Sequence, residues 1–389
     1  MIPQSDIDLF SDDVVDNPYD AYRELRDLGP VVYLTRLEMF AISRYDDVRQ
    51  TLLDASTFCS GQGVGLNDAI NELGRGTLLA SDGEEHAHLR AIVGRPLTPK
   101  SLADLRPDAQ ALADGLVGRL VERRTFDAVT DLATVIPTTW VPDLIGWPDD
   151  GRDHLVAWGE ATFNVMGPMN ERAQQAVPSV MEMVEFAARV ANSGAVPPGT
   201  MAAGIIDAAE QGEIEPAQCP ALMLDYLGPS LDTTISALGN AIWLFAEHQD
   251  QWELLRRDPS LLQNAFNEVL RYDAPLTMFS RVTTTETTIG GVDVAAGSRV
   301  LVMYASANRD ERRWEDPDRF DITRPASGHL GFGHGTHACA GMGLARLEAS
   351  TVLTALLEQV ASFQLSGTPR RKVHNLIRAF DSLPIEVTG

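Results

Sequence analysis

Cysteine is scarce in this sequence. Three cysteines, Cys59, Cys219 and Cys339, stand far apart among 389 residues, and no two of them form a Cys-x-x-Cys pair. Such a set excludes a disulfide framework and indicates a reducing compartment. The sequence also lacks the apolar run of roughly 20 residues that could span a bilayer, and its acidic, polar start differs from a signal peptide. We therefore expect a cytoplasmic protein.

Basic residues are also few. Lysine and arginine number 31 against 55 acidic residues, which gives a formal net charge of −24. A nucleic-acid-binding protein needs a basic footprint, so this charge argues against that class. Repeats, low-complexity segments and a convincing linker are missing too. A chain of this length commonly forms one large domain or two domains, and without a linker we predict a single domain over residues 1–389.

The sequence is rich in helical patterns. Apolar residues recur at three- and four-residue spacing over most of residues 111–264, as they do in amphipathic helices. Two short β-rich stretches near residues 31–45 predict a hairpin, and residues 287–310 predict two strands joined by glycine turns. We expect a mainly α fold with small β-sheets.

One expected helix is unusually long. Residues 220–248 would extend roughly 40–45 Å at about 1.5 Å per residue. Its middle, LGPSLDTTIS, is polar, and Pro229 cannot donate to the carbonyl of Asp225, so a kink is expected there. The alternative is two shorter helices, of which Ser230 caps the second.

A loop rich in glycine and histidine, GFGHGTHACAG at residues 331–341, precedes the last expected helix. A cysteine at a helix N-terminus meets free N–H groups and the positive end of the dipole, which favour a thiolate. A phosphate-binding loop would need a Gly-Lys-Ser/Thr ending that is missing. A zinc site using His334, His337 and Cys339 lacks a fourth ligand at a recognisable spacing. A haem iron with one axial thiolate needs only one cysteine. An inert cysteine is the remaining alternative.

The stretch FGHGTHACAG resembles the haem-binding signature of the cytochromes P-450, Phe-Gly-x-Gly-x-His-x-Cys-x-Gly, at every defined position. The resemblance implies the family's fold, a triangular prism-like helical core around haem b. It also implies that Cys339 is the axial ligand of the haem iron and that Phe332 belongs to the haem-binding loop.

Two other stretches carry the resemblance further. In SDGEEHAHLR, His86 and Arg90 lie four residues apart on one helix face. The resemblance implies that they bind the haem propionates together with Arg281 and His337, since carboxylates attract clustered donors. Taken alone, each of them would be interpreted as a member of a surface ion pair. The family usually has two prolines where this chain has Gly-Glu.

The stretch EVLR places Glu268 and Arg271 three residues apart, where they can pair. The resemblance implies that Arg324 joins them in a buried network that supports the haem-binding core. Loss of one member would leave a buried charge without a partner.

The stretch PSLDTT matches the family's Ala-Gly-x-Asp/Glu-Thr-Thr, with Pro229 and Ser230 in place of Ala-Gly. A threonine within a helix often bonds back to its own helix. The resemblance implies instead that Asp232 and Thr233 are catalytic and deliver protons during oxygen activation, with Pro229 enforcing a helix distortion that glycine permits in relatives.

These features predict a haem-thiolate monooxygenase that inserts one oxygen atom from dioxygen into a C–H bond. We expect no flavin or ferredoxin module after Gly389, and the resemblance implies that NAD(P)H acts indirectly, through a reductase and a small ferredoxin. Such ferredoxins are acidic, and Arg346 is one candidate for docking them. A peroxide-driven peroxygenase typically lacks the acid–threonine pair. A non-enzymatic haem-binding sensor is a further alternative.

Substrate residues are predicted from the family's topology and are apolar, as in most ligand pockets. They are Val64, Leu66, Phe163, Met166, Leu227, Leu276 and Phe279. The two phenylalanines resemble those of bacterial members that oxidise small para-substituted aromatics, including O-demethylation of methoxy rings. The stretch SGQGVGLND offers no arginine for a substrate carboxylate, and Arg75 is the nearest. We therefore expect a small hydrophobic substrate, an aromatic ether or phenol.

Overall fold

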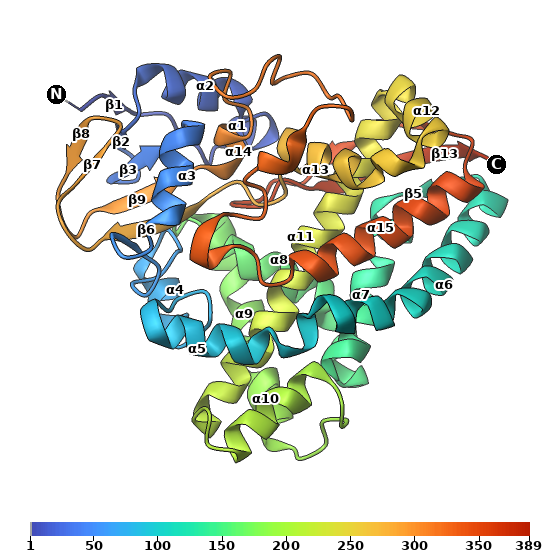
Figure 1. The fold of residues 1–389 in the computed structure, drawn as a ribbon, viewed down its shortest axis with the longest axis horizontal. Helices are drawn as coiled ribbons and strands as arrows, with labels where there is room; N and C mark the ends of the chain where they lie inside the picture. The colour runs from blue at the N-terminus through green and yellow to red at the C-terminus, as the bar shows by residue number, and fades with distance from the viewer. Residues whose placement is uncertain (1) are drawn as a thin grey trace.

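The computed structural model describes residues 2–389 and has a roughly triangular outline (Figure 1). Its centre is the long helix α11, Cys219–Glu247, which crosses the molecule. Most side chains of α11 are buried. The helices that pack against it are α7 (Val135–Ile145), α8 (Leu155–Asn164), α9 (Glu171–Asn192), α10 (Met201–Glu210), α12 (Gln249–Arg257), α13 (Leu262–Tyr272) and α15 (Met342–Gln359).

Helix α11 runs without interruption through Pro229. The hydroxyl of Ser230 donates to the carbonyl of Leu227 at 2.9 Å instead of capping a new helix. The alternative of two shorter helices is therefore wrong. A proline inside a helix costs about 3 kcal/mol, and the burial of α11 on several sides offsets that cost.

The remaining helices surround this centre. Helix α6 lies along α15, and α5 leads from the β-rich corner toward α6 (Figure 1). Their bounds are α1 (Asp12–Asp16), α2 (Tyr19–Leu28), α3 (Tyr45–Leu53), α4 (Asp68–Leu73), α5 (Gly83–Val93), α6 (Pro99–Arg123) and α14 (Tyr304–Ala307).

The largest sheet has six strands in the order β1-β2-β3-β9-β6-β4. Strands β2 and β3 form the expected antiparallel hairpin, β3 pairs with β9 in parallel, and β9 pairs with β6 so that Val302 lies opposite Phe279. The strands are β1 (Gln4–Ser5), β2 (Val32–Leu34), β3 (Met39–Ile42), β4 (Phe58–Cys59), β6 (Phe279–Thr283) and β9 (Arg299–Val302).

Residues 287–310 contain one strand more than the two expected. Strands β7 (Thr287–Ile289) and β8 (Val292–Val294) form a separate hairpin, and β9 joins the large sheet. Gly290 and Gly291, with φ of 54° and 84°, form the hairpin turn, and Gly297, with φ of 76°, forms the next one. Two further small sheets contain β5 (Thr125–Asp127), β10 (Ser362–Leu365), β11 (Arg370–Arg371), β12 (Phe380–Ser382) and β13 (Pro384–Thr388).

Buried apolar side chains form two clusters, one around α11 and α15 and one around the six-stranded sheet. Together with the helical majority, this arrangement confirms the expected mainly α fold with small sheets. Within residues 2–389, every helix is too short or too polar to cross a bilayer.

Candidate active site

A cavity lies where the two apolar clusters meet. Its volume is about 240 Å³, and its wall is formed by α5, α11, β6, α15 and the loop before α15. Ten residues expected from the sequence to be functional line it: His86, Arg90, Phe163, Thr233, Leu276, Phe279, Arg281, Phe332, His337 and Cys339.

Four of the seven expected pocket residues lie elsewhere. Val64, Leu66 and Met166 are buried in the sheet-side cluster, and Leu227 is fully buried in the helical cluster. On α11 the cavity-lining face includes Pro229 and its neighbours at helical spacing. Leu227 is not among the lining residues of α11, and its side chain packs into the helical cluster instead.

The loop around Cys339 is held in a fixed shape. Gly333 and Gly335 have φ of 68° and 71°, values that favour glycine. The Cys339 amide donates to the carbonyl of Phe332 at 2.9 Å. A Cβ at Gly335 would overlap the backbone oxygen of Leu52 at the end of α3. The loop can therefore pack against α3 only with glycine at this position.

The Cys339 thiol lines the cavity just before α15. Its accessible surface is cavity wall, while protein atoms surround it on the other sides. Burial raises the pKa of the thiol, and the amides of Gly341 and Met342 and the Arg90 guanidinium act in the opposite direction. The expected effect of the helix N-terminus is present, but burial outweighs it. A metal cation bound to the sulfur would stabilise the thiolate and so lower the pKa of the thiol further.

The zinc alternative finds no support in the geometry. Among residues 2–389, no three His, Cys, Asp or Glu side chains are grouped to hold a metal ion. His334, His337 and Cys339 therefore do not form a coordination set. A haem iron needs only one protein ligand on the thiolate side, and Cys339 can provide it.

Four donor-bearing side chains share the cavity wall with Cys339. The rings of His86 and His337 are 4.0 Å apart between centroids. Arg281 donates to the carbonyl of Ser280 at 2.7 Å, and Arg90 forms no ion pair with any residue in the range 2–389. This surplus of hydrogen-bond donors, two of them on guanidinium groups, suits an anionic ligand.

His337 faces only one acid. Its Nε2 lies 3.4 Å from Asp82 Oδ1 and makes no hydrogen bond, although the atom is buried. Burial, His86 and Arg281 lower the pKa of His337 to about 4, while Asp82 acts in the opposite direction. The side chain thus keeps a buried polar atom ready for a partner in the cavity.

Asp232 lies behind the cavity wall in contact with a histidine that the sequence did not indicate. Its Oδ2 is 3.4 Å from His374 Nε2 and has no hydrogen-bond partner. His374 Nδ1 accepts from the amides of Leu376 and Ile377 at 3.2 and 3.1 Å, so the neutral ring carries its proton on Nε2. That nitrogen also lies 3.1 Å from the carbonyl of Glu160.

A lysine completes this group. Lys372 binds Glu160 with 2.8 Å between Nζ and Oε2. Burial raises the pKa of Asp232, His374 and Lys372 lower it, and Glu160 raises it. The Glu160 side chain is 40% exposed, whereas His374 is fully buried. The group therefore extends from the surface to Asp232.

The hydroxyl of Thr233 donates to the carbonyl of Pro229 at 2.6 Å. This is the bond back to the helix that a mid-helix threonine often makes. The hydroxyl oxygen keeps its lone pairs, and Thr233 lines the cavity. It can therefore still accept a hydrogen bond from a molecule held there.

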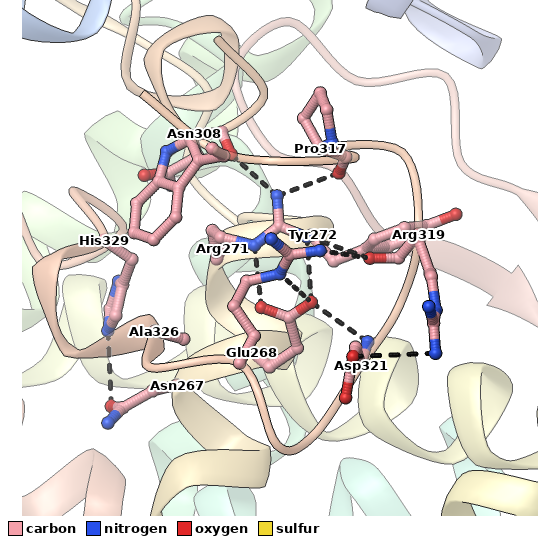
Figure 2. Close-up of polar contacts among 12 residues, drawn as sticks. Asn267, Glu268, Arg271, Tyr272, Asn308, Pro317, Arg319, Asp321, Ala326 and His329 are labelled. Atoms are coloured by element: carbon pink, nitrogen blue, oxygen red, sulfur yellow. Dashed lines mark hydrogen bonds and ion pairs between the residues drawn. The ribbon is translucent and has the colours of Figure 1, made fainter. Parts of the chain in front are cut away.

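The residues of EVLR meet the later arginine in the interior. Both carboxylate oxygens of Glu268 bind Arg271, at 2.7 and 2.8 Å, and neither side chain is exposed. Arg324 Nε lies 3.2 Å from Glu268 Oε1. Figure 2 shows this carboxylate also facing Asp321, whose amide donates to it at 3.1 Å.

Arg271 also binds the chain that precedes the cysteine loop. Its Nη1 donates to the carbonyls of Asn308 and Pro317, each at 2.9 Å, and its Nη2 donates to that of Arg319 at 3.3 Å (Figure 2). One buried guanidinium thus ties α13 to residues 308–319. The network fixes the segment that leads to the cysteine loop.

Two carboxyl groups of the cavity, Asp225 and Glu348, lie outside the sequence motifs described above. Asp225 Oδ2 accepts from the Leu78 amide at 2.8 Å, and burial raises the pKa of Asp225 to about 7. Glu348 on α15 is fully buried, neither of its oxygens has a partner within the protein, and burial raises its pKa to about 8. An isolated acid in the apolar run ALMLDYLG was the available signal for Asp225.

Known proteins with similar sequences decide the family. The Cytochrome P-450 family profile matches residues 200–380. Cytochrome P-450 CYP199A2 of Rhodopseudomonas palustris is 38% identical over 391 residues, which cover 100% of this chain and 95% of that protein. The chain belongs to the cytochrome P-450 family. As a cytochrome P-450 monooxygenase it is an oxidoreductase, and the family implies a haem iron.

Two other cytochromes P-450 extend the comparison. The 6-deoxyerythronolide B hydroxylase of Saccharopolyspora erythraea is 30% identical, with 98% of this chain and 99% of that protein covered. The structure of cytochrome P-450 CREJ in complex with (4-ethylphenyl) dihydrogen phosphate has a TM-score of 0.88 and 28% identity, covering 96% of this chain and 98% of that one. The cavity described above fits the family's haem, because it has one available thiol, an anion-binding group of side chains and a glycine loop beside it.

Proposed function

We propose that this cytochrome P-450 inserts one oxygen atom from dioxygen into a C–H bond of a small hydrophobic aromatic substrate, by hydroxylation or oxidative O-demethylation. The observation that carries the proposal is the shared cavity wall. One cavity is lined by Cys339, by Thr233, by the two phenylalanines Phe163 and Phe279, and by the four donor side chains described above, His86, Arg90, Arg281 and His337.

Each part of the wall has its own role in this proposal. Bound haem supplies the oxygen activation. Cys339 would hold the iron, Phe332 would lie beside the haem, and the propionates would be bound by His86, Arg90, Arg281 and His337. Glu268, Arg271 and Arg324 would keep the cysteine loop in place.

Asp232 and Thr233 would handle protons. Burial raises the pKa of Asp232, so this carboxyl group gives up its proton less readily than an exposed acid. It adjoins a polar group that reaches the surface. The Thr233 hydroxyl lies beside it on the cavity face of α11 and can position a donor such as water. This pair favours dioxygen over peroxide as the oxidant.

The substrate proposal rests on aromatic geometry. The rings of Phe163 and Phe279 are nearly parallel, at 18°, with centroids 6.5 Å apart. Phe279 also meets Tyr304 edge to face at 6.3 Å. Such walls favour flat rings. The phosphate ester bound by CREJ is a para-substituted aromatic, which supports the same size class for this chain.

Electrons would come from NAD(P)H through a reductase and an acidic ferredoxin. Arg346 is less free for docking than the sequence indicated. Its Nη2 donates to Asn267 Oδ1 at 2.9 Å, and its guanidinium lies 5.4 Å from the centroid of Phe332. We propose the ferredoxin system without assigning Arg346 as its principal contact.

The dithionite-reduced protein under carbon monoxide tests the cofactor. We expect the absorption band of a haem-thiolate in the wild type and its loss in Cys339→Ser, while Cys59→Ser keeps it. A Cys339→Ser protein with unchanged haem content, band and turnover would contradict the proposal. Turnover of methoxyarenes with a ferredoxin system, compared with peroxide alone, then tests the oxidant; activity with peroxide only would identify the peroxygenase alternative.

A further inference from the structure

Asp225 is the carboxyl group on the cavity face of α11 that the proposed chemistry does not use. It lines the cavity together with Phe163 and Leu276. One oxygen, Oδ2, accepts from the Leu78 amide at 2.8 Å. The other oxygen has no hydrogen-bond partner, and unlike Asp232 Oδ2 it is not sealed within protein atoms. It therefore faces the cavity as a free acceptor.

The same residue offers a second acceptor. Pro229, four positions later, has no N–H to donate to the carbonyl of Asp225. The hydroxyls of Tyr226 and Ser230 on the same helix are already used, because they donate to the carbonyls of Val93 and Leu227, each at 2.9 Å. This part of the wall therefore has acceptors in excess of donors.

No lysine, arginine or histidine among the described residues lowers the pKa of Asp225. Burial dominates the effect on its pKa, and the Leu78 amide is the single group that opposes burial. Arg95 is the cation on the neighbouring segment, and it is bound to Glu213 through both oxygens. The cationic side chains of the cavity, Arg90 among them, belong to the group around Cys339.

We propose that the substrate carries a hydrogen-bond donor group, a hydroxyl or an ammonium, that binds the free oxygen of Asp225. The inference rests on the proposed function and narrows its substrate class. A buried acceptor without a donor costs free energy, whereas a donor supplied by the ligand recovers it. An anionic group at the same place would meet a carboxyl group and no cation, so we expect carboxylate substrates to bind most weakly.

Helical geometry places this contact at the far end of the substrate. Asp225 precedes Thr233 by eight residues, which is about 12 Å along the helix axis. The donor and the oxidised carbon therefore lie at opposite ends of the molecule. A para-substituted ring such as 4-methoxyphenol meets this requirement.

Spin-state titration with matched ligands tests the proposal. The ligands are 4-methoxyphenol, 1,4-dimethoxybenzene, which lacks the donor, and 4-methoxybenzoate. A hydrogen bond to a charged or strongly polar buried acceptor changes affinity by about tenfold or more. We expect wild type to bind the phenol at least tenfold more tightly than the diether, and the benzoate most weakly.

The variant Asp225→Asn tests the role of the Asp225 oxygen that has no hydrogen-bond partner. Asparagine can still accept from the Leu78 amide while turning its NH₂ toward the cavity. We expect the preference for the phenol to disappear and the benzoate to gain affinity. Asp207→Asn, a change of the same charge on an exposed position of α10, should keep the wild-type ratios.

The outcomes separate the two proposals. Unchanged phenol-to-diether ratios in Asp225→Asn overturn the inference, as does the absence of a spin shift with every ligand. A normal carbon-monoxide band in the same samples shows that the haem site is intact. Tighter binding of 4-methoxybenzylamine than of the phenol identifies ammonium as the donor, and the reverse identifies hydroxyl.

Discussion

Asp225 and Asp232 are on one helix, seven positions apart, and their neighbours differ. Asp225 meets a single backbone amide, whereas Asp232 lies beside His374 with Lys372 close by. Burial raises the pKa of both. The carboxyl group of Glu348 has no hydrogen-bond partner, and burial raises its pKa as well. The cavity region thus contains three carboxyl groups that favour the protonated form more than an exposed acid does.

A change at Asp232 should affect the oxygen reaction and spare binding. In Asp232→Asn we expect ferredoxin-driven turnover to fall about 100-fold, as for a lost proton donor. Methoxyarene affinity should stay within twofold. In His374→Leu we expect the pH–rate profile to move to higher pH, because His374 lowers the pKa of Asp232 while Lys372 and Glu160 remain.

The measurements are rates against pH and the fraction of electrons lost as hydrogen peroxide. His154→Gln, an exposed histidine on the 3₁₀ turn before α8, serves as the control. A purely structural role for His374 would lower all rates without moving the profile, and that result would contradict the prediction.

At this scale the sequence could predict residues within short motifs. His86, Arg90, Arg281, His337 and Cys339 all reach one cavity. The sequence could not predict contacts between residues that are far apart along the chain. The contact of Asp232 with His374 and that of Asp225 with Leu78 depend on tertiary packing, and an apolar residue of the pocket looks the same in a sequence as one of the core.

Among the elements, the cysteine loop depends most on glycine. In Gly335→Ala two costs combine, the positive φ and the overlap with the Leu52 carbonyl. Gly199 has φ of 81° and no atom within 4 Å of an added Cβ, so Gly199→Ala carries only the conformational cost of about 1–2 kcal/mol.

We expect Gly335→Ala to lower the free energy of unfolding by at least about 2 kcal/mol more than Gly199→Ala, since backbone overlap cannot relax cheaply. Haem content should fall with it. Urea unfolding at constant m measures the difference. An equal loss in the free energy of unfolding of the two variants would contradict the prediction, because it would show that α3 can move away from the loop at little cost.

Element positions were largely predictable because they follow local pattern. The long helix was expected at residues 220–248 and is found at Cys219–Glu247. The strands of residues 287–310 were harder, since short strands separated by glycine carry little periodicity. The continuity of α11 through Pro229 was also beyond a local argument, because distributed burial, which the sequence does not display, decides it.

Across the whole molecule, Asp273 connects the most distant segments. Its carboxylate binds Arg371 at 2.8 Å, Tyr19 at 2.6 Å and Arg378. Arg378 in turn donates to the carbonyl of Asp16 at 2.8 Å. Burial would raise the pKa of Asp273, but Arg371 and Arg378 outweigh it and hold the pKa below its usual 3.8.

Asp273→Asn should therefore destabilise the protein at pH 7 by about 3–5 kcal/mol, because buried guanidinium groups lose their counter-charge. A carboxylate whose pKa is lower in the folded chain stabilises it above the unfolded pKa and loses that contribution as pH falls. The difference between wild type and variant should stay constant from pH 7 to about 5 and shrink below about 3.9.

Urea midpoints at several pH values provide the measurement. Asp381→Asn is a matched control, because its pair with Arg370 is exposed, at 51% and 67%, and exposed pairs contribute about 0–1 kcal/mol. A loss of stability in Asp273→Asn no larger than that in the control would contradict the prediction.

The assignment of residues 1–389 to a single domain stays a prediction.

The link from Arg378 to Asp16 spans 362 positions of the chain, and this has a consequence for biosynthesis. A ribosome that has translated α11 and the cysteine loop has yet to deliver His374 and Arg378. Until it does, Asp232 lacks His374, and Asp273 lacks Arg371 and Arg378. We therefore expect the contacts of Asp232 with His374 and of Asp273 with its arginines to form only after the C-terminal segments have been synthesised.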